Sequence, residues 1–331
     1  MLTNQHLEVW NFVCRFGEQV LLDRYTELVE PAFQGNHERG WGDTRFVLNK
    51  VQYINAGTKA KPSPALAGRF VKDTVLHQEQ KLVGGKLLPA DGELPSAPSS
   101  LFVLILASHR LLFVREHRGS PDAKQFAATI DRFIRIERIK LIEKLHLASR
   151  ATEERRSKAA LHRDIPLPEV TATPVVLQSD IEEFVKKFAR IRKVAIEIAP
   201  TNDEPDNEEF FQALRANGSA INAKKSRVEY SATPKESLDP KATILQVKAA
   251  QNGQATFSIA GEDRAGNALT GDNEELRMRV PLHSAHAEVP DKAGDAVAAF
   301  RDLADGGAVN PGGGEARSHA TLMALAARLF G

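Results

Sequence analysis

The sequence predicts an α+β fold: a mixed β-sheet N-terminal domain with a hairpin, a long basic connecting helix and a C-terminal α/β sandwich. Two strand-length apolar runs, Leu101–Leu106 and Leu111–Val114, are separated by four residues, a common hairpin loop length. The 33 residues of Asp131–Arg163 contain neither proline nor glycine and are typical of a helix. The second half alternates strand-like and helix-like segments and ends on two consecutive strands, which favours an α+β sandwich.

A chain of 331 residues is expected to form two domains. Prolines cluster at Pro166–Pro174 and place the boundary near residue 165. We therefore predict an N-terminal mixed α/β domain (1–165), a C-terminal α+β domain (166–305), and a Gly-rich joint with a terminal helix (306–331). The formal net charge of +1 gives no overall attraction for a polyanion, so any nucleic-acid affinity must come from a local patch.

Cysteine content and hydropathy limit the location of the protein. The only cysteine, Cys14, rules out an internal disulfide and a cysteine-based zinc site within one chain, and its apolar neighbours predict a core position. The N-terminus lacks the basic and long apolar regions of a signal peptide. The longest apolar run, Leu101–Ala107, is well short of the roughly 20 residues that cross a bilayer. We expect a cytoplasmic protein that does not enter a membrane.

The first 100 residues mix helical and strand patterns. Apolar residues recur near helical spacing over Leu7–Val29 and predict a helix, and the glycines of Gln34–Thr44 predict a loop. Alternation with one phase shift over Arg45–Ala56 predicts a strand with a bulge. Phe70–Leu88 is expected to supply one or two further strands, and the three prolines of Pro89–Ser100 predict an irregular connection.

After the hairpin, Ser120 is the predicted N-cap of a helix with Pro121 at its first position. This helix is expected to continue through most of Asp131–Arg163. The further predicted elements follow in chain order: a helix from the capping box of Ser179 and Glu182 to Ile191, a strand over Lys193–Pro200, a helix over Asp206–Gly218, a strand over Ser226–Ala232, a helix over Lys241–Ala250, strands within Gln254–Leu269 and Glu275–Leu282, and a helix over Ala316–Phe330.

The long predicted helix carries the strongest functional signal. Between Asp131 and Asp164 the ten lysines and arginines outnumber the six acids by four. A row of cations along a helix can neutralise several phosphates, as a nucleic-acid binder requires. A solvent-exposed helix whose charges form i,i+4 ion pairs has a similar composition, so this alternative remains open. The candidate nucleic-acid-binding residues are Arg132, Arg135, Arg138, Lys140, Lys144, Arg155, Arg156 and Lys158.

The sequence contains no diagnostic catalytic motif, so an enzyme is the less favoured class. The enzymatic alternative is a divalent-metal nuclease, which needs an acid followed by an acid-x-Lys triplet. Asp73 with Glu79 and Lys81 fits this pattern, and only this alternative involves a cofactor, Mg²⁺. No other metal site is expected, because none of the ten histidines has ligand spacing.

The polar break in the predicted hairpin, Ser108 to Arg110, is interpreted as its turn. The sequence offers no acid or nucleophile beside it, which excludes it as a catalytic site. If the turn is exposed, His109 and Arg110 lie at a tip that contacts a partner.

Two regions carry a resemblance. Residues 97–134 hold the hairpin and the helix after it, and residues 194–267 hold a strand ending in Ala199-Pro200, an acidic helix start and an Asn-Gly before the Thr256 strand. This arrangement resembles a group of poorly characterised prokaryotic proteins of unknown function that are often encoded among antiviral defence genes. The resemblance implies a context and transfers no catalytic residue.

These observations predict a non-enzymatic subunit of a prokaryotic antiviral system that binds nucleic acid or a partner protein through the basic helix. The expected partners are DNA or RNA and other subunits of a defence complex. Two alternatives remain at this stage. One is the metal-dependent nuclease, and the other is a protein scaffold whose basic stripe pairs with an acidic partner.

Overall fold

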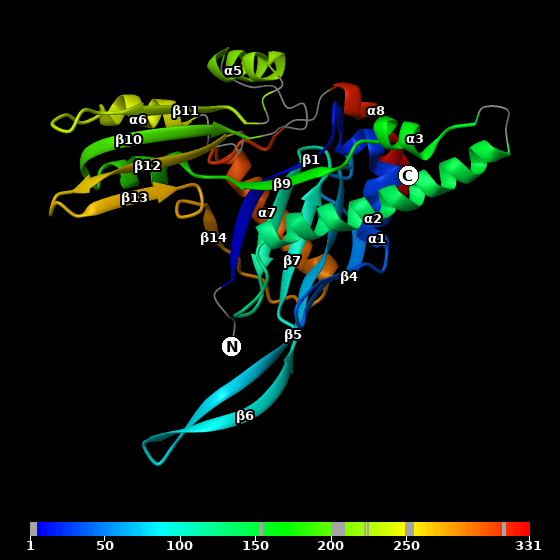
Figure 1. The fold of residues 1–331 in the computed structure, drawn as a ribbon, viewed down its shortest axis with the longest axis horizontal. Coiled ribbons are helices and arrows are strands. Elements are labelled where there is room, and N and C mark those ends of the chain that lie inside the picture. The colour runs from blue at the N-terminus through cyan, green and yellow to red at the C-terminus, as the bar shows by residue number, and fades with distance from the viewer. Residues whose placement is uncertain are drawn as a thin grey trace.

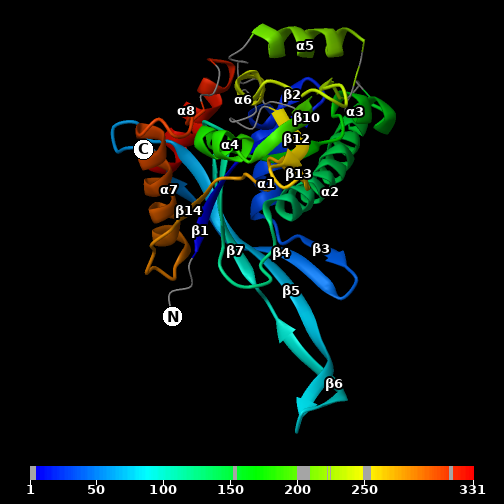
Figure 2. The ribbon, with the colours of Figure 1, turned by 90° about the vertical axis from the view of Figure 1, so that its left-hand side faces the viewer.

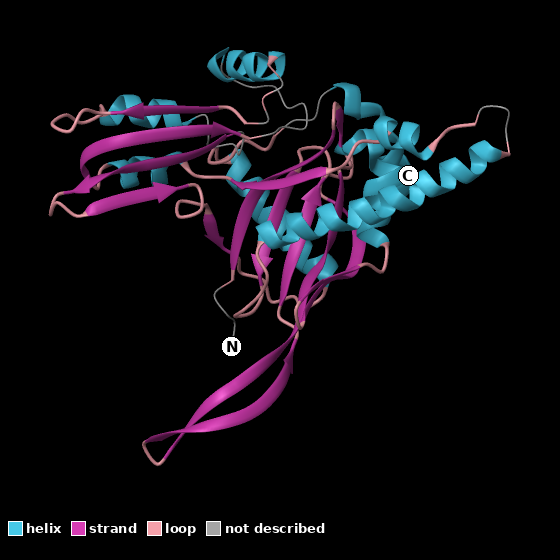
Figure 3. Cartoon of the chain, in the orientation of Figure 1, coloured by secondary structure: helices cyan, strands magenta, loops and turns pink. Residues whose placement is uncertain are grey.

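The computed structural model contains two antiparallel sheets with helices packed against them, which confirms the predicted α+β class (Figures 1 and 3). The structure describes residues 5–151, 155–199, 209–221, 223, 225–248, 255–312 and 316–331. The division of the chain into domains at residues 165 and 305 stays a prediction.

The larger sheet follows the order β14-β1-β8-β7-β5-β4-β3, with β2 and β9 also paired to β1 and β6 paired to β5. Its strands are β1 (His6–Phe16), β2 (Gln19–Val20), β3 (Glu38–Trp41), β4 (Thr44–Asn55), β5 (Pro64–Val83), β6 (Lys86–Ser96), β7 (Ser99–Ile105), β8 (Arg110–Arg115), β9 (Glu169–Pro174) and β14 (Arg279–Pro281). The smaller sheet has the order β11-β10-β12-β13. Its strands are β10 (Phe188–Ile198), β11 (Arg227–Ser231), β12 (Ala255–Asp263) and β13 (Ala268–Asp272).

The helices cover both faces of the larger sheet and the buried face of the smaller one (Figure 2). They are a 3₁₀ turn η1 (Leu21–Arg24), a π turn η2 (Tyr25–Val29), α1 (Glu30–Gln34), α2 (Ala123–Arg150), α3 (Lys158–Asp164), α4 (Gln178–Val185), α5 (Glu209–Ala220), α6 (Pro240–Lys248), α7 (Val289–Asp305) and α8 (Ala316–Phe330). No helix in the described part of the chain is both long enough and apolar enough to span a membrane.

The central strands of the larger sheet are buried on both faces. Alternate residues of its central strands pack under α1 and α2 on one side and under α7 on the other. Every residue of β7 is buried, because side chains on both faces of this strand are covered. The two apolar runs over Leu101–Leu106 and Leu111–Val114 therefore form the central hairpin that the sequence predicts.

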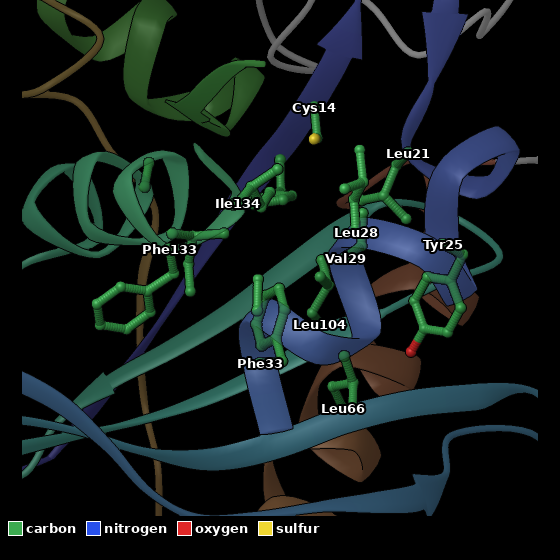
Figure 4. Close-up of a cluster of buried hydrophobic side chains, with 14 of the residues drawn as sticks. Cys14, Leu21, Tyr25, Leu28, Val29, Phe33, Leu66, Leu104, Phe133 and Ile134 are labelled. Atoms are coloured by element: carbon green, nitrogen blue, oxygen red, sulfur yellow. The ribbon is translucent and has the colours of Figure 1, made fainter. Parts of the chain in front are cut away.

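Aromatic rings fill the core beneath α2. The ring of Phe126 lies 4.8 Å from that of Phe102 and 5.5 Å from that of Phe70, between ring centroids. Cys14 lies in the same core, which confirms its predicted position, and burial followed by the charge of Asp131 raises the pKa of its thiol (Figure 4). A thiol held neutral in this way is a packing residue and not a nucleophile.

A buried charge cluster fastens α7 to the sheet. The Glu116 carboxylate accepts hydrogen bonds from the Lys292 ammonium at 2.8 Å, the Ser99 hydroxyl at 2.6 Å and the Arg69 guanidinium at 3.0 Å. Burial alone would raise the pKa of Glu116, but these donors outweigh it and lower the pKa. The cluster satisfies a buried carboxylate with two cations, so it stabilises the packing of α7.

The predicted helix over Leu7–Val29 is wrong: this segment forms β1, β2 and the turns η1 and η2. β1 is covered on both faces, so its apolar residues do not alternate with polar ones, and some fall at helical spacing by coincidence. The predicted loop over Gln34–Thr44 contains β3, which pairs with β4. β4 itself is confirmed, with a register shift between Asn49 and Gln52 that corresponds to the expected bulge.

The irregular connection predicted over Pro89–Ser100 is also wrong. Residues up to Ser96 form β6, and the prolines are tolerated because β6 is an edge strand that pairs only with β5. The long helix starts at Ala123 with Asp122 as its N-cap, two residues after the predicted start at Pro121. The Ser120 hydroxyl instead donates to the carbonyl of Ser99. The helix ends at Arg150, and α3 is a separate element.

The smaller sheet contains the strands predicted over Lys193–Pro200, Ser226–Ala232 and within Gln254–Leu269. The strand predicted over Glu275–Leu282 is shorter, and as β14 it pairs with β1 in the larger sheet. The helices around the smaller sheet also differ from the prediction. Leu177 and not Ser179 is the N-cap of α4, and the predicted helix residues Phe188 and Ile191 belong to β10. The residues Asp206 and Asn252-Gly253 lie outside the described part. Helix α7 had no counterpart among the predicted elements, whereas α8 has the predicted bounds Ala316–Phe330.

Candidate functional site

The basic segment forms a helical hairpin, in which α3 folds back against α2 (Figure 1). Arg138 holds the two together. Its guanidinium donates to the carbonyls of Ile165, Pro166 and His162, at 2.7, 3.0 and 3.0 Å, and only 4% of Arg138 is exposed. The His146 ring and the Ser149 hydroxyl contact the backbone of Arg156 near the end of the hairpin where the chain passes from α2 to α3. We call the exposed side chains of this hairpin, residues 132–164, the α2–α3 ridge.

The candidate nucleic-acid-binding residues divide into two groups. Arg138 is buried, and Arg135 is held by Asp131 and by the carbonyl of Pro168, so both have structural partners. Three cations of the ridge pair with acids: Lys140 with Glu137, Arg156 with Asp164 and Lys158 with Glu143. Of the three arginines at three-residue spacing, Arg132 is thus exposed, whereas Arg135 and Arg138 are held by partners within the protein.

The exposed surface of the ridge is strongly positive. Among the described residues between 132 and 164, eight lysines and arginines are exposed against two acids, Glu143 and Asp164. Five of the eight make no ion pair with any described residue: Arg132, Lys144, Arg150, Arg155 and Arg163. Because 18 residues are five helical turns, Arg132 and Arg150 lie on the same side of α2, about 27 Å apart.

Two aliphatic side chains interrupt this positive surface. Ile139 and Leu147 are 51% and 63% exposed, and both lie on the exposed side of α2 between Arg132 and Arg150. The described exposed surface of the ridge contains no Phe, Tyr or Trp side chain that could stack on a base. Its chemistry is therefore suited to phosphate contacts, with an additional small apolar surface.

The prediction that the tip of the central hairpin is exposed is wrong. His109 and Arg110 are 1% and 4% exposed. The carbonyl of His109 accepts the Phe12 amide at 2.9 Å, and the Arg110 guanidinium donates to the carbonyl of Asn310 at 3.2 Å. The segment before α8 covers this turn, and a Cβ added at Gly312 would lie 2.9 Å from the carbonyl oxygen of Ser108. Residues 309–312 of the predicted Gly-rich joint therefore pack on the hairpin.

The structure does not bring the predicted nuclease residues together. Asp73, Glu79 and Lys81 all lie on β5, and six residues of strand separate the two carboxylates by about 20 Å. Asp73 also pairs with the Arg45 guanidinium at 2.6 Å. Two carboxylates at this separation cannot share one metal ion, because an Mg²⁺ ligand lies about 2.1 Å from the metal. No group of three His, Cys, Asp or Glu side chains within the described residues has a metal-binding arrangement.

A polar cleft of about 310 Å³ lies on the open face of the smaller sheet. The exposed residues Thr256 and Ser258 of β12 line this cleft, and Phe257 between them both lines it and belongs to the core of the smaller sheet. Lys124 of α2 reaches across to Glu274 at 2.9 Å, between nitrogen and oxygen. The remaining charged lining residues are Glu197, Arg227 and Asp272. The lining mixes both charges and hydroxyl groups, so the cleft has no preference for a polyanion.

A family model with the description Domain of unknown function (DUF4747) matches residues 157–283, about 40% of the chain. No curated protein matches the chain. The matched segment starts at the N-cap of α3 and includes the whole smaller sheet, β9 and β14. It therefore contains all the cleft residues except Lys124. The resemblance of residues 194–267 to proteins of unknown function agrees with this match.

Proposed function

We propose that the α2–α3 ridge binds the phosphate backbone of nucleic acid and that the protein is a non-enzymatic binding subunit. The observation that carries this proposal is the excess of exposed cations over exposed acids, eight to two, on one helical hairpin of the described chain. A cation with no acid partner attracts a phosphate without first breaking an ion pair. Five of the eight cations meet this condition.

The charge of the ridge also differs from that of the rest of the chain. The whole chain has a net charge of +1, so an excess of four positive charges over Asp131–Asp164 leaves the remainder negative. A local positive patch on an otherwise acidic protein directs a polyanion to one surface. The ridge is not expected to recognise a base sequence, because phosphate contacts carry no sequence information directly.

The test measures binding of labelled double-stranded DNA and single-stranded RNA by fluorescence anisotropy at several salt concentrations. The variant K144Q/R150Q/R155Q removes three unpaired cations, and on duplex DNA it should reduce the slope of log K against log salt by about 2.7. The control K59Q/K61Q/K235Q removes three exposed lysines outside the ridge and should leave the slope unchanged. Salt-independent binding, or equal slopes for the two variants, contradicts the proposal.

A second candidate is docking of an acidic partner protein, which is favoured by the exposed Ile139 and Leu147. The variant I139S/L147S keeps every charge of the ridge. It leaves nucleic-acid binding unchanged if phosphates alone are recognised, and it weakens a protein complex if these side chains enter an interface. Purifying the protein with the products of its neighbouring genes, as wild type and as I139S/L147S, separates the two candidates.

We also propose that the protein acts in antiviral defence, and this part of the proposal is supported only by the resemblance of residues 97–134 and 194–267 to proteins encoded among antiviral defence genes. A subunit of a prokaryotic defence system is expected to protect cells only when its ridge is intact. Phage plaque counts on cells carrying the native gene cluster, with wild type or K144Q/R150Q/R155Q in place, test this. Equal plaque counts with and without the gene refute the antiviral role and leave nucleic-acid binding to its own test.

A further inference from the structure

The far half of β5 and all of β6 form an arm that leaves the body of the protein (Figures 1 and 2). Up to Asp73, β5 pairs with β4 and β7, and from Thr74 onward it pairs only with β6. Gly84 and Gly85, with φ of +57° and +80°, close the tip between Val83 and Lys86. This two-residue turn with two positive φ angles is the one favoured in hairpins. We call residues 74–96 the arm.

The arm is unusual in its exposed apolar content. Six of its aliphatic side chains are at least 42% exposed: Leu76, Leu82, Val83, Leu87, Leu88 and Leu94. An isolated two-stranded hairpin is at best marginally stable in water, and one that leaves large apolar side chains exposed gains little from folding. Contact with another surface would bury these side chains and stabilise the arm.

The strand register divides the side chains of the arm between two faces. Opposed residues of an antiparallel pair lie on the same face, so the pairs Leu76–Leu94 and Leu82–Leu87 share one face with Gln78. The members of this uncharged face are Thr74, Leu76, Gln78, Gln80, Leu82, Leu87, Pro89, Gly92, Leu94 and Ser96. The arm is described in full, and none of these ten side chains carries a charge. Charges lie on the opposite face, among them the exposed pair His77–Glu93.

The order of side chains along the uncharged face is the same in both directions. Along β5 it is Leu76, Gln78, Gln80, Leu82, with the paired leucines of β6 beside each end. When a second arm packs antiparallel on this face, each leucine pair meets a leucine pair and the glutamines meet in the middle. The absence of charge removes like-charge repulsion between two identical surfaces. A contact of this kind has the self-complementarity that a two-fold interface requires.

We propose that the uncharged face of the arm binds the same face of a second copy of this chain, with the two arms antiparallel. Ten residues of a two-stranded ribbon measure about 33 Å by 10 Å, so each copy covers roughly 330 Å². This is below the ~800 Å² per partner of a stable complex. The dimer is therefore weak and its population depends on protein concentration.

Sedimentation velocity on the full chain between about 1 and 100 µM tests the proposal. Wild type shifts from monomer to dimer over this range. Leu87 and Leu88 are adjacent leucines of β6 on opposite faces, 68% and 42% exposed, and provide a matched pair of variants. L87E places a charge on the uncharged face and weakens the dimer at least tenfold, whereas L88E leaves the dimer intact. A wild type that stays monomeric at 100 µM, or equal behaviour of the two variants, refutes the proposal.

Cross-linking tests the antiparallel arrangement. Cys14 is fully buried, so an introduced cysteine is the reactive thiol. With a bismaleimide of about 13 Å span, Q80C yields a covalent dimer, because Gln80 lies opposite Gln78 of the other arm and stacked sheets are ~10 Å apart. Neither K81C, on the other face, nor T74C, at the base, cross-links. Cross-linking of T74C or of K81C refutes the antiparallel arrangement. Binding of monomeric wild type to phosphatidylcholine vesicles through Leu82 and Leu87 refutes the proposal that the partner is a second copy of the chain.

Discussion

The two halves of β5 have similar apolar content and opposite environments. Residues 64–73 lie between β4 and β7, and Phe70 is fully buried there, whereas Leu82 in residues 74–83 is 69% exposed. The two faces of the body are covered by helices, and the arm has one partner strand. The same contrast separates Arg138 from Arg132 on α2. Residue type alone therefore does not say whether a side chain stabilises the fold or meets a partner.

The largest effect is expected from truncation in the buried half of β5. Phe70 stacks on Phe46 and meets the edge of Phe126, each at 5.5 Å between ring centroids. F70A leaves a cavity among these rings and should lower the free energy of unfolding by about 4 kcal/mol. L82A in the exposed half should leave it unchanged. Urea denaturation of both variants measures the difference, and a loss for L82A comparable to that for F70A would falsify the contrast.

The next effect is expected at the buried charge cluster. E116Q leaves Lys292 buried without its carboxylate and should cost about 3 kcal/mol, whereas E38Q breaks an exposed ion pair with Arg45 and should change nothing measurable. The pKa of Glu116 is below its ordinary 4.5, so the unfolded state binds the proton more readily. The contribution is complete above pH about 4.5 and is lost as the pH falls through the folded pKa.

Urea denaturation of wild type and E116Q at pH 7 and at successively lower pH measures this contribution. The difference between the two proteins should shrink as the pH decreases below about 4.5. A difference that stays constant down to acid unfolding would show that the carboxylate charge does not act in the cluster.

An intermediate effect is expected on α2, where two arginines six residues apart have different environments. R138M removes the donor from three carbonyls and should lower the free energy of unfolding by about 2 kcal/mol. R132M should leave stability unchanged and reduce the salt slope of duplex DNA binding by about 0.9. Thermal unfolding and anisotropy titrations on both variants check this. Equal destabilisation by the two would remove the distinction between buried and exposed arginines.

The smallest effect is expected at the tip of the arm. Gly85 has a φ of +80°, which an L-residue adopts at a cost of about 1 kcal/mol. G85A should speed hydrogen exchange in residues 74–96 about fivefold and leave the urea midpoint of the body unchanged. Exchange measured by mass spectrometry resolves the arm from the body. A midpoint that falls together with arm protection would mean that the arm and the body unfold as one unit.

The sequence was most informative where one physical cause dominates the pattern. Both apolar runs of the central hairpin are buried, so Leu101–Leu106 and Leu111–Val114 are recognisable as strands. The smaller sheet has one buried face, and β10 and β12 alternate accordingly. The basic stripe was also visible as composition. Composition does not show which cations face solvent, because their exposure depends on where α3 packs along α2.

The sequence by itself determined the α+β class, the central hairpin, the core position of Cys14, the one-sided strands of the smaller sheet and the bounds of α8. These follow from local periodicity and hydrophobicity, which act over a few residues. Tertiary structure alone decided that β1 is a strand, that the tip at His109 is buried and that the arm is exposed. Each depends on whether segments far along the chain, such as α7 and residues 309–312, cover the residues concerned, and no local pattern records such contacts.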